Sequence, residues 1–152
     1  MGTVADEEIS AAILQLMEKT KTIVEGAGAT TLAALLYKKF ETNKKNIACV
    51  LSGGNIDVTT LAYIIERGLV QEGRMVKLGI ELDDKPGMLN QLTKVVADIK
   101  ANIMHVEHDR LSLYLPYGRT VVSLTLETRG HPHIQELLSA LKKNGYLVRR
   151  MA

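Results

Sequence analysis

The sequence predicts an α/β protein in two parts, an incomplete α/β domain over residues 1–73 and a small βαββαβ domain over residues 74–152. Two observations support this division. Before residue 73, three stretches have hydrophobic residues at helical spacing, and one short apolar run between them is typical of a buried strand. After residue 73, alternating strand patterns and amphipathic helical patterns follow one another in the order strand, helix, strand, strand, helix, strand.

The first part is predicted to contain three helices. Apolar residues recur at helical spacing over residues 9–17 after an acidic start, which suits a helix amino terminus. Residues 26–40 are rich in alanine and predict a second, buried helix. Asp57 can cap a third helix, which is expected to end near Gly68 or Gly73.

The apolar run at residues 46–51 predicts a strand that is covered on both faces, as in a parallel sheet. The only cysteine, Cys49, lies in this run, so we expect a buried free thiol in a reducing, cytoplasmic compartment. Such a strand needs neighbouring strands for its backbone donors and acceptors, and the sequence predicts no other strand in this part of the chain. We therefore expect residues 1–73 to be a fragment of a larger α/β domain, in preference to a domain that borrows strands from another subunit.

The second part begins with a strand at residues 76–82, where apolar and polar residues alternate, and continues through a turn into a helix at residues 89–99. The remaining predicted elements are strands at 102–111 and 120–128, a helix from Pro132 to about Lys143, and a strand at 146–151. The βαββαβ order predicts a ferredoxin-like antiparallel sheet with both helices on one face. The open face and edges predict a homo-oligomer formed through this part.

The composition argues against nucleic-acid and membrane partners. The 19 basic and 17 acidic residues nearly balance, and one Phe and five Tyr form no base-stacking motif. Neither a secretory signal nor an apolar stretch of membrane-spanning length is recognisable. No metal site is predicted either, because His105 and His108 would point to opposite faces of a strand.

Five short motifs carry a resemblance to a known family. They are TIVEGAGA at 22–29, VLSGGN at 50–55, ERGL at 66–69, VEHDR at 106–110 and LETRG at 126–130. Together they closely resemble the end of the pyridoxal-phosphate-dependent threonine ammonia-lyases, also called threonine dehydratases. The second part resembles the ACT regulatory domain of those enzymes. The resemblance implies that residues 1–73 are the C-terminal fragment of a pyridoxal-phosphate-dependent, tryptophan synthase β-like catalytic domain.

The resemblance also implies cofactor contacts. Ser52 would bind the pyridine nitrogen, Gly53 would let the backbone approach the cofactor, and Glu25 would face the cofactor region. The plain alternatives are a strand-to-helix turn for Ser52 and Gly53, and a helix-start carboxylate for Glu25. In the family the Schiff-base lysine precedes every segment seen here. We therefore expect no catalytic residue in this chain, which is expected to be inactive alone; pyridoxal phosphate would be bound by the intact enzyme.

The turn that contains Pro86, Gly87, Met88 and Leu89 resembles the ACT loop that binds an amino-acid effector, and Asn102 could contribute from a strand start. The alternative is a plain turn that binds nothing. The expected effector is an amino acid of the isoleucine, valine or threonine class. Two functions remain open: the regulatory portion of an enzyme that converts L-threonine to 2-oxobutanoate and ammonia in isoleucine biosynthesis, or a free-standing amino-acid-binding ACT module.

Overall fold

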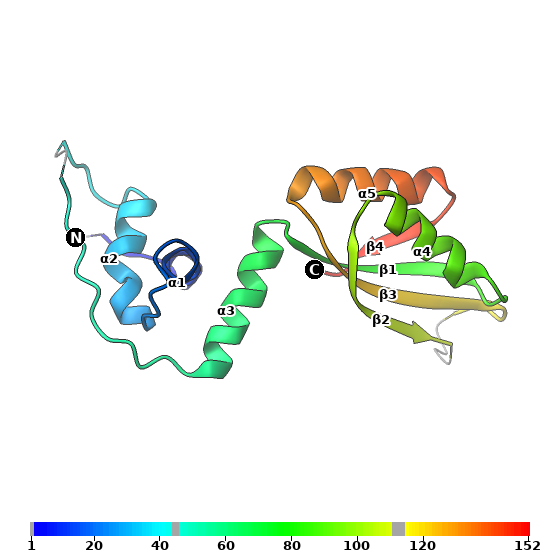
Figure 1. Cartoon of the computed structure of the whole chain (residues 1–152), viewed down its shortest axis with the longest axis horizontal. Helices are drawn as coiled ribbons and strands as arrows, with labels where there is room; N and C mark the ends of the chain where they lie inside the picture. Colours follow the sequence, from blue (N-terminus) through cyan, green and yellow to red (C-terminus); the bar gives the residue numbers. More distant parts are fainter. Residues whose placement is uncertain (1, 44–45, 111–114) are drawn as a thin grey trace. The chain divides into compact units, whose positions relative to one another are not determined.

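The computed structural model describes residues 2–43, 46–110 and 115–152. The chain divides into two compact units, one up to Gly68 and one from Leu69 onward (Figure 1). The boundary expected from the sequence lay after residue 73.

The first unit contains three helices, α1 (Asp6–Thr20), α2 (Gly26–Leu36) and most of α3 (Val58–Gln71). Helices α1 and α2 pack together, and α3 begins directly after Asp57, as predicted. No helix in the described part of the chain combines the length and apolar character needed to span a membrane. The buried core of the unit comprises Ala12, Ile13, Leu16, Val24, Ala29, Ala33 and Ile64.

Three predictions for this unit were wrong. Residues 46–51 form no strand, and their side chains are exposed or half-exposed, with Val50 73% exposed. The reason is that the described residues of this unit contain no strand with which the run could pair. Cys49 is consequently only half-buried. Helix α2 ends at Leu36, before the predicted end at residue 40.

The second unit is an antiparallel sheet with two helices, in the predicted βαββαβ order. The strand order across the sheet is β2-β3-β1-β4, as in a ferredoxin-like sheet. Strand β2 was predicted to reach residue 111, but it ends at Asp109, and residue 111 lies outside the described residues. The elements are β1 (Met75–Asp83), α4 (Met88–Asp98), β2 (Asn102–Asp109), β3 (Arg119–Glu127), α5 (His131–Lys143) and β4 (Leu147–Arg150).

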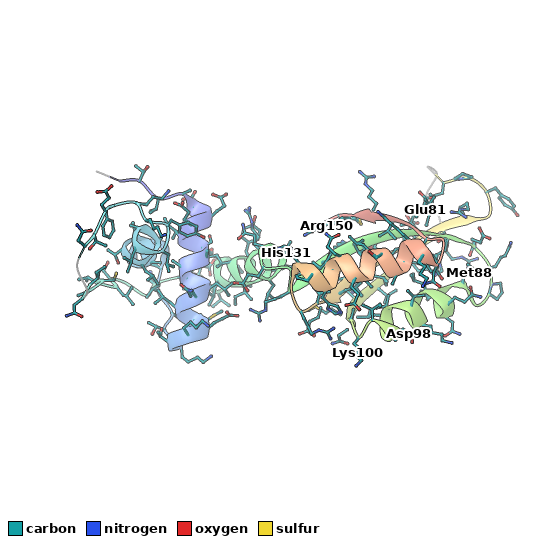
Figure 2. All side chains as sticks on the ribbon, turned by 90° about the horizontal axis from the view of Figure 1, so that it is seen from above. Glu81, Met88, Asp98, Lys100, His131 and Arg150 are labelled. Atoms are coloured by element: carbon teal, nitrogen blue, oxygen red, sulfur yellow. The ribbon has the colours of Figure 1, made fainter. Side chains whose placement is uncertain are left out.

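Both helices cover the same face of this sheet, and the view from above shows them lying over it, with Met88 and Asp98 at opposite ends of α4 (Figure 2). Every second residue of β1 and β3 points into the core beneath the helices, which explains the alternation seen in the sequence. The fully buried side chains of this core are Val76, Leu78, Ile80, Leu92, Val96, Val122, Leu124, Leu126, Ile134, Leu137 and Leu141.

The buried side chain of His133 joins the two helices. Its Nδ1 accepts a hydrogen bond from the Arg129 amide at 3.1 Å, and its Nε2 lies 2.8 Å from the carbonyl oxygen of Ile99. Because Nδ1 is the acceptor, Nε2 carries the proton and donates to that carbonyl. His133 therefore fixes the start of α5 to the end of α4.

Candidate functional site

A pocket of about 340 Å³ lies where β1 meets α4. The turn residues Pro86, Gly87, Met88 and Leu89 all line it, so the structure brings together the four residues predicted from the turn. The pocket's other lining residues are Leu82, Asp83, Asp84, Lys85, His108, Arg110 and Thr120.

Gly87 shapes the entrance to α4. It precedes the first residue of the helix with φ of +89°, a left-handed conformation that glycine adopts without steric cost. No atom lies within 4 Å of the position that a Cβ would take there. The amino end of α4, with its partial positive charge, therefore opens into the pocket.

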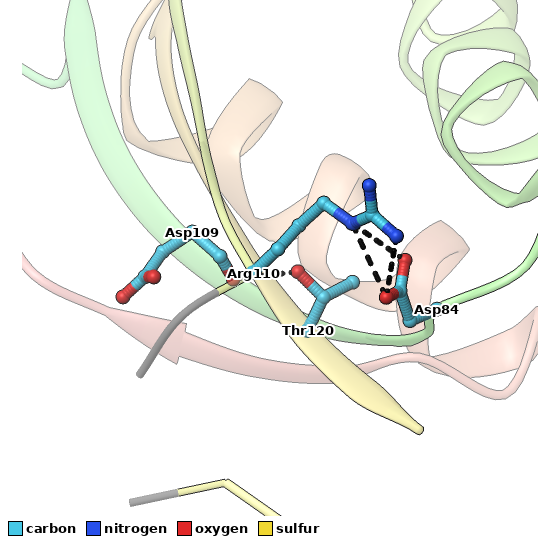
Figure 3. Close-up of polar contacts among 4 residues, drawn as sticks. All are labelled: Asp84, Asp109, Arg110 and Thr120. Carbon is cyan, nitrogen blue, oxygen red and sulfur yellow. Dashed lines mark hydrogen bonds and ion pairs between the residues drawn. The ribbon is translucent and has the colours of Figure 1, made fainter. Parts of the chain in front are cut away.

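Opposite the turn, Arg110 forms a two-pronged ion pair with Asp84 (Figure 3). The guanidinium Nε lies 3.0 and 3.2 Å from the two carboxylate oxygens of Asp84, and one terminal nitrogen lies 2.9 Å away. The Arg110 hydrogen bonds lower the pKa of the Asp84 carboxyl, and the same contact raises the pKa of Arg110. Arg110 directly follows β2, and the end of this strand is held by Thr120, whose hydroxyl donates to the Asp109 carbonyl at 2.6 Å.

The neighbouring carboxylate is already held within the domain. Asp83 accepts a hydrogen bond from Arg119 at 2.7 Å and lies 3.4 Å from the Lys85 ammonium. These two contacts, that of Arg119 first, lower the pKa of Asp83. Arg119 also lies 3.6 Å from Glu81, so the strand charges neutralise one another beside the pocket.

In the first unit, the structure brings together two of the residues expected near a cofactor. The Glu25 amide donates to the Gly53 carbonyl at 3.4 Å, and the Glu25 carboxylate fills the place that a Cβ on Gly53 would need. Glu25 precedes α2 but makes no side-chain cap. Ser52 is exposed, and the hollow that Glu25 lines is not lined by Ser52 or Gly53. Glu25 and Gly53 therefore pack closely together in this turn.

The histidines of β2 point to opposite faces of the sheet. His105 pairs in register with Thr125 on the open face, whereas His108 pairs with Val122 on the helix-covered face. Within the described ranges, no group of three or more His, Cys, Asp or Glu side chains is placed to hold a metal ion.

The comparison with protein families decides what the second unit is. The ACT domain family model matches residues 71–146, which is half of the chain. The chain belongs to the ACT domain family. The pocket described above is thus the loop pocket between the first strand and first helix of an ACT domain.

Relatives extend the similarity beyond the ACT domain. An L-threonine ammonia-lyase of Geobacter sulfurreducens is 54% identical over 95% of this chain, and one of Thermotoga maritima is 42% identical over 98% of it. The chain spans 36% and 37% of these relatives' lengths. Among solved structures, the ACT domain from GTP pyrophosphokinase of Chlorobium tepidum covers 51% of this chain and 96% of its own, with 24% identity and a TM-score of 0.41.

Asn102, the fifth residue expected at the effector loop, does not join the other four in one copy of the ACT domain. It pairs in register with Glu127, and its amide nitrogen lies 3.2 Å from the Glu127 carboxylate. Glu127 in turn pairs with Met75, at the start of β1, while the pocket follows the end of β1. Asn102 therefore lies at the opposite end of the sheet.

The charged residues of this ACT pocket were not predicted from the sequence. Asp84 belonged to the predicted turn but was given no role, and Arg110 was named only as the end of the VEHDR motif. Because Asp84 and Arg110 are 26 residues apart, only the strand pairing brings them together. The available signal was the presence of Arg110 in a motif that carries the family resemblance.

Proposed function

We propose that this chain is the C-terminal and regulatory part of a threonine ammonia-lyase, and that its ACT domain senses an amino-acid effector. The observation that carries this proposal is the 54% identity to an L-threonine ammonia-lyase over 95% of the chain, which includes both units. A free-standing ACT module would explain similarity in the second unit only. A cytoplasmic location and a role in isoleucine biosynthesis belong to the same proposal.

The exposed apolar surface of the first unit supports its assignment to a larger catalytic domain. Ile47, Val50 and Leu51 are 44%, 73% and 37% exposed, in an extended run without strand partners among the described residues. Burial of apolar surface contributes roughly 25 cal/mol per Å², so leaving such a run in water is unfavourable. Strands of a complete α/β sheet would cover this run and pair with its backbone.

The intact enzyme would use pyridoxal phosphate, which stabilises carbanions as an electron sink when it is bound. Ser52, Gly53 and Glu25 would border the cofactor from this chain. Ser52 is exposed on a turn whose close packing requires glycine, since a Cβ on Gly28 would overlap the Ser52 carbonyl. These residues offer one edge of a site but do not enclose one, so no step of the reaction is assigned to them.

The loop pocket is the proposed effector site. Pro86, Gly87, Met88 and Leu89 would surround an amino acid of the isoleucine, valine or threonine class. Support comes from the volume of about 340 Å³, from the amino end of α4 and from the apolar side chains of Leu82, Met88 and Leu89 beside charged groups. Small-ligand sites combine an apolar lining with a few placed polar groups in this way.

The open face of the ACT sheet supports self-association as part of the proposal. Leu147 and Met151 are 66% and 55% exposed there, beside a hollow of about 610 Å³ that Gly79 and Val121 also line. Exposed apolar side chains on an uncovered sheet face favour an interface with a second copy.

A domain exchange tests the lyase assignment. The matching C-terminal segment of the Geobacter sulfurreducens relative is replaced by this whole chain, and ammonia release from L-threonine is measured with and without isoleucine, valine and threonine analogues. We expect the exchanged enzyme to keep its activity, and we expect that activity to change when the amino acid that this chain binds is added. The control exchange transfers residues 69–152 only. Activity in the control together with none in the whole-chain exchange would contradict the assignment of the first unit.

A further inference from the structure

We propose that the Asp84–Arg110 ion pair is the element of the ACT pocket that recognises a zwitterionic amino acid: Arg110 receives the ligand's carboxylate, and the released Asp84 receives its ammonium group. This inference rests on the proposed effector-sensing function. It adds the two residues that would hold the ligand and the reason that the ligand carries both charges.

The Asp84–Arg110 ion pair has the geometry in which a guanidinium group binds a carboxylate. Arg110 contacts both oxygens of Asp84 at 2.9–3.2 Å, which is the two-pronged arrangement that guanidinium groups form with carboxylates. Asp84 therefore already occupies the place where a ligand carboxylate would bind. The pair lines the pocket together with the turn residues.

The exposure of the ion pair allows Arg110 to exchange Asp84 for a ligand. The Arg110 side chain is 62% exposed and that of Asp84 is 28% exposed, so water and solutes reach the pair from the guanidinium side. Exposed ion pairs contribute little to stability, because hydration competes with them. The carbonyl of the preceding residue, Asp109, is fixed by Thr120, so the backbone that carries Arg110 stays in place while its side chain changes partner.

A ligand that replaces this ion pair must leave both Asp84 and Arg110 with a partner of opposite charge. A ligand with only a carboxylate would take Arg110 and leave Asp84 unpaired beside the apolar wall. An α-amino acid brings one carboxylate and one ammonium, so both protein charges remain paired after the exchange. The nearby cations do not offer the same exchange, since Asp83 holds Lys85 and also holds Arg119 at 2.7 Å.

The apolar residues of the pocket indicate which ligand side chain would fit. Leu82 is 2% exposed and forms the floor with Met88 and Leu89, which are half-buried. A ligand anchored at the ion pair would direct an aliphatic side chain against this wall. The structure thus favours a small aliphatic α-amino acid over a polar one.

The test measures binding to the full chain by isothermal titration calorimetry. L-isoleucine, L-valine and L-threonine are the probes, and the one that binds most tightly is then compared with its amide, which lacks the carboxylate, and with its deaminated acid, which lacks the ammonium. For the unaltered chain we expect both analogues to bind more weakly by about tenfold or more, because each loses a charge-assisted contact.

Two variants separate the roles. R110Q should bind the amino acid and its amide with similar, weak affinity, and D84N should no longer discriminate against the deaminated acid. R110K keeps the positive charge but cannot make the two-pronged contact of a guanidinium group. Its affinity for the amino acid should lie between those of the unaltered chain and R110Q. R129Q is the matched control, because Arg129 is exposed and lies at the other end of the sheet. Circular dichroism verifies folding, and R110K carries the test if R110Q is unfolded.

The outcomes are distinguishable. If the unaltered chain binds none of the three probes, the proposed effector-sensing function is refuted, and this inference with it. If the unaltered chain binds a probe but R110Q discriminates against the amide as strongly as R129Q does, only the ion-pair exchange is refuted.

Discussion

Replacing His133 by leucine tests how the two helices of the ACT domain are held together. His133 is 5% exposed and connects the Arg129 amide to the Ile99 carbonyl through its two ring nitrogens, at 3.1 and 2.8 Å. Leucine removes both hydrogen bonds and leaves a partly buried donor and acceptor without partners. At about 1–2 kcal/mol for each such group, we expect the free energy of unfolding to fall by about 2–4 kcal/mol.

The neighbouring histidine is a matched control. His131 lies on the same helix, is exposed, and makes one contact, from Nε2 to the Gln71 carbonyl at 2.9 Å. H131L should therefore lower the free energy of unfolding by no more than about 1 kcal/mol. Urea denaturation followed by far-ultraviolet circular dichroism measures both variants. Equal losses for H133L and H131L would refute the role given to His133.

Three further predictions concern other contacts. G87A should destabilise the ACT domain by about 1 kcal/mol in thermal melts, since φ of +89° strains alanine although space is open; an unchanged melting temperature would contradict this. Glu8, 2.7 Å from Lys39, has its pKa lowered below 4.5, first by the Lys39 hydrogen bond. This contribution is present above pH 4.5 and lost as pH falls through the lowered pKa, so E8Q should flatten the acid side of the stability profile. L147D should reduce self-association in sedimentation velocity runs; an unchanged oligomer would exclude the sheet face around Leu147 as the interface.

The ACT domain could be predicted from the sequence because its pattern is local. The predicted strand at 76–82 is observed as Met75–Asp83, and the predicted helix at 89–99 as Met88–Asp98. Alternating burial of neighbouring residues reports one buried face directly. The run at 46–51 was mispredicted because apolar residues show a tendency to be buried, whereas a strand also requires a partner strand.

The site was only partly predictable, because it depends on the direction in which strands run. The turn residues 86–89 are adjacent in sequence and line the pocket, as expected for a single loop. Asn102 was expected near this loop because it begins the next strand. Both β1 and β2 are antiparallel to β3, however, so they run in the same direction, and Asn102 lies at the end of the sheet where β1 starts, with Glu127 of β3 between Asn102 and Met75. Arg110, directly after β2, reaches the loop instead.

The two units differ in how completely they bury their own apolar side chains, and this difference bears on regulation. The ACT domain has a core of its own, in which residues such as Leu78 and Leu124 are fully buried. The first unit leaves Val50 and Val58 more than 70% exposed, which agrees with the proposal that it is part of a larger catalytic domain. Under the proposed function, an effector bound to the ACT domain would regulate the enzyme only if it bound two states of the enzyme with different affinity. The proposed exchange at Arg110 would change the contacts of Asp84, which lies in the loop that precedes α4, so an effector would favour a state of the enzyme in which this loop leaves Arg110 free to bind it.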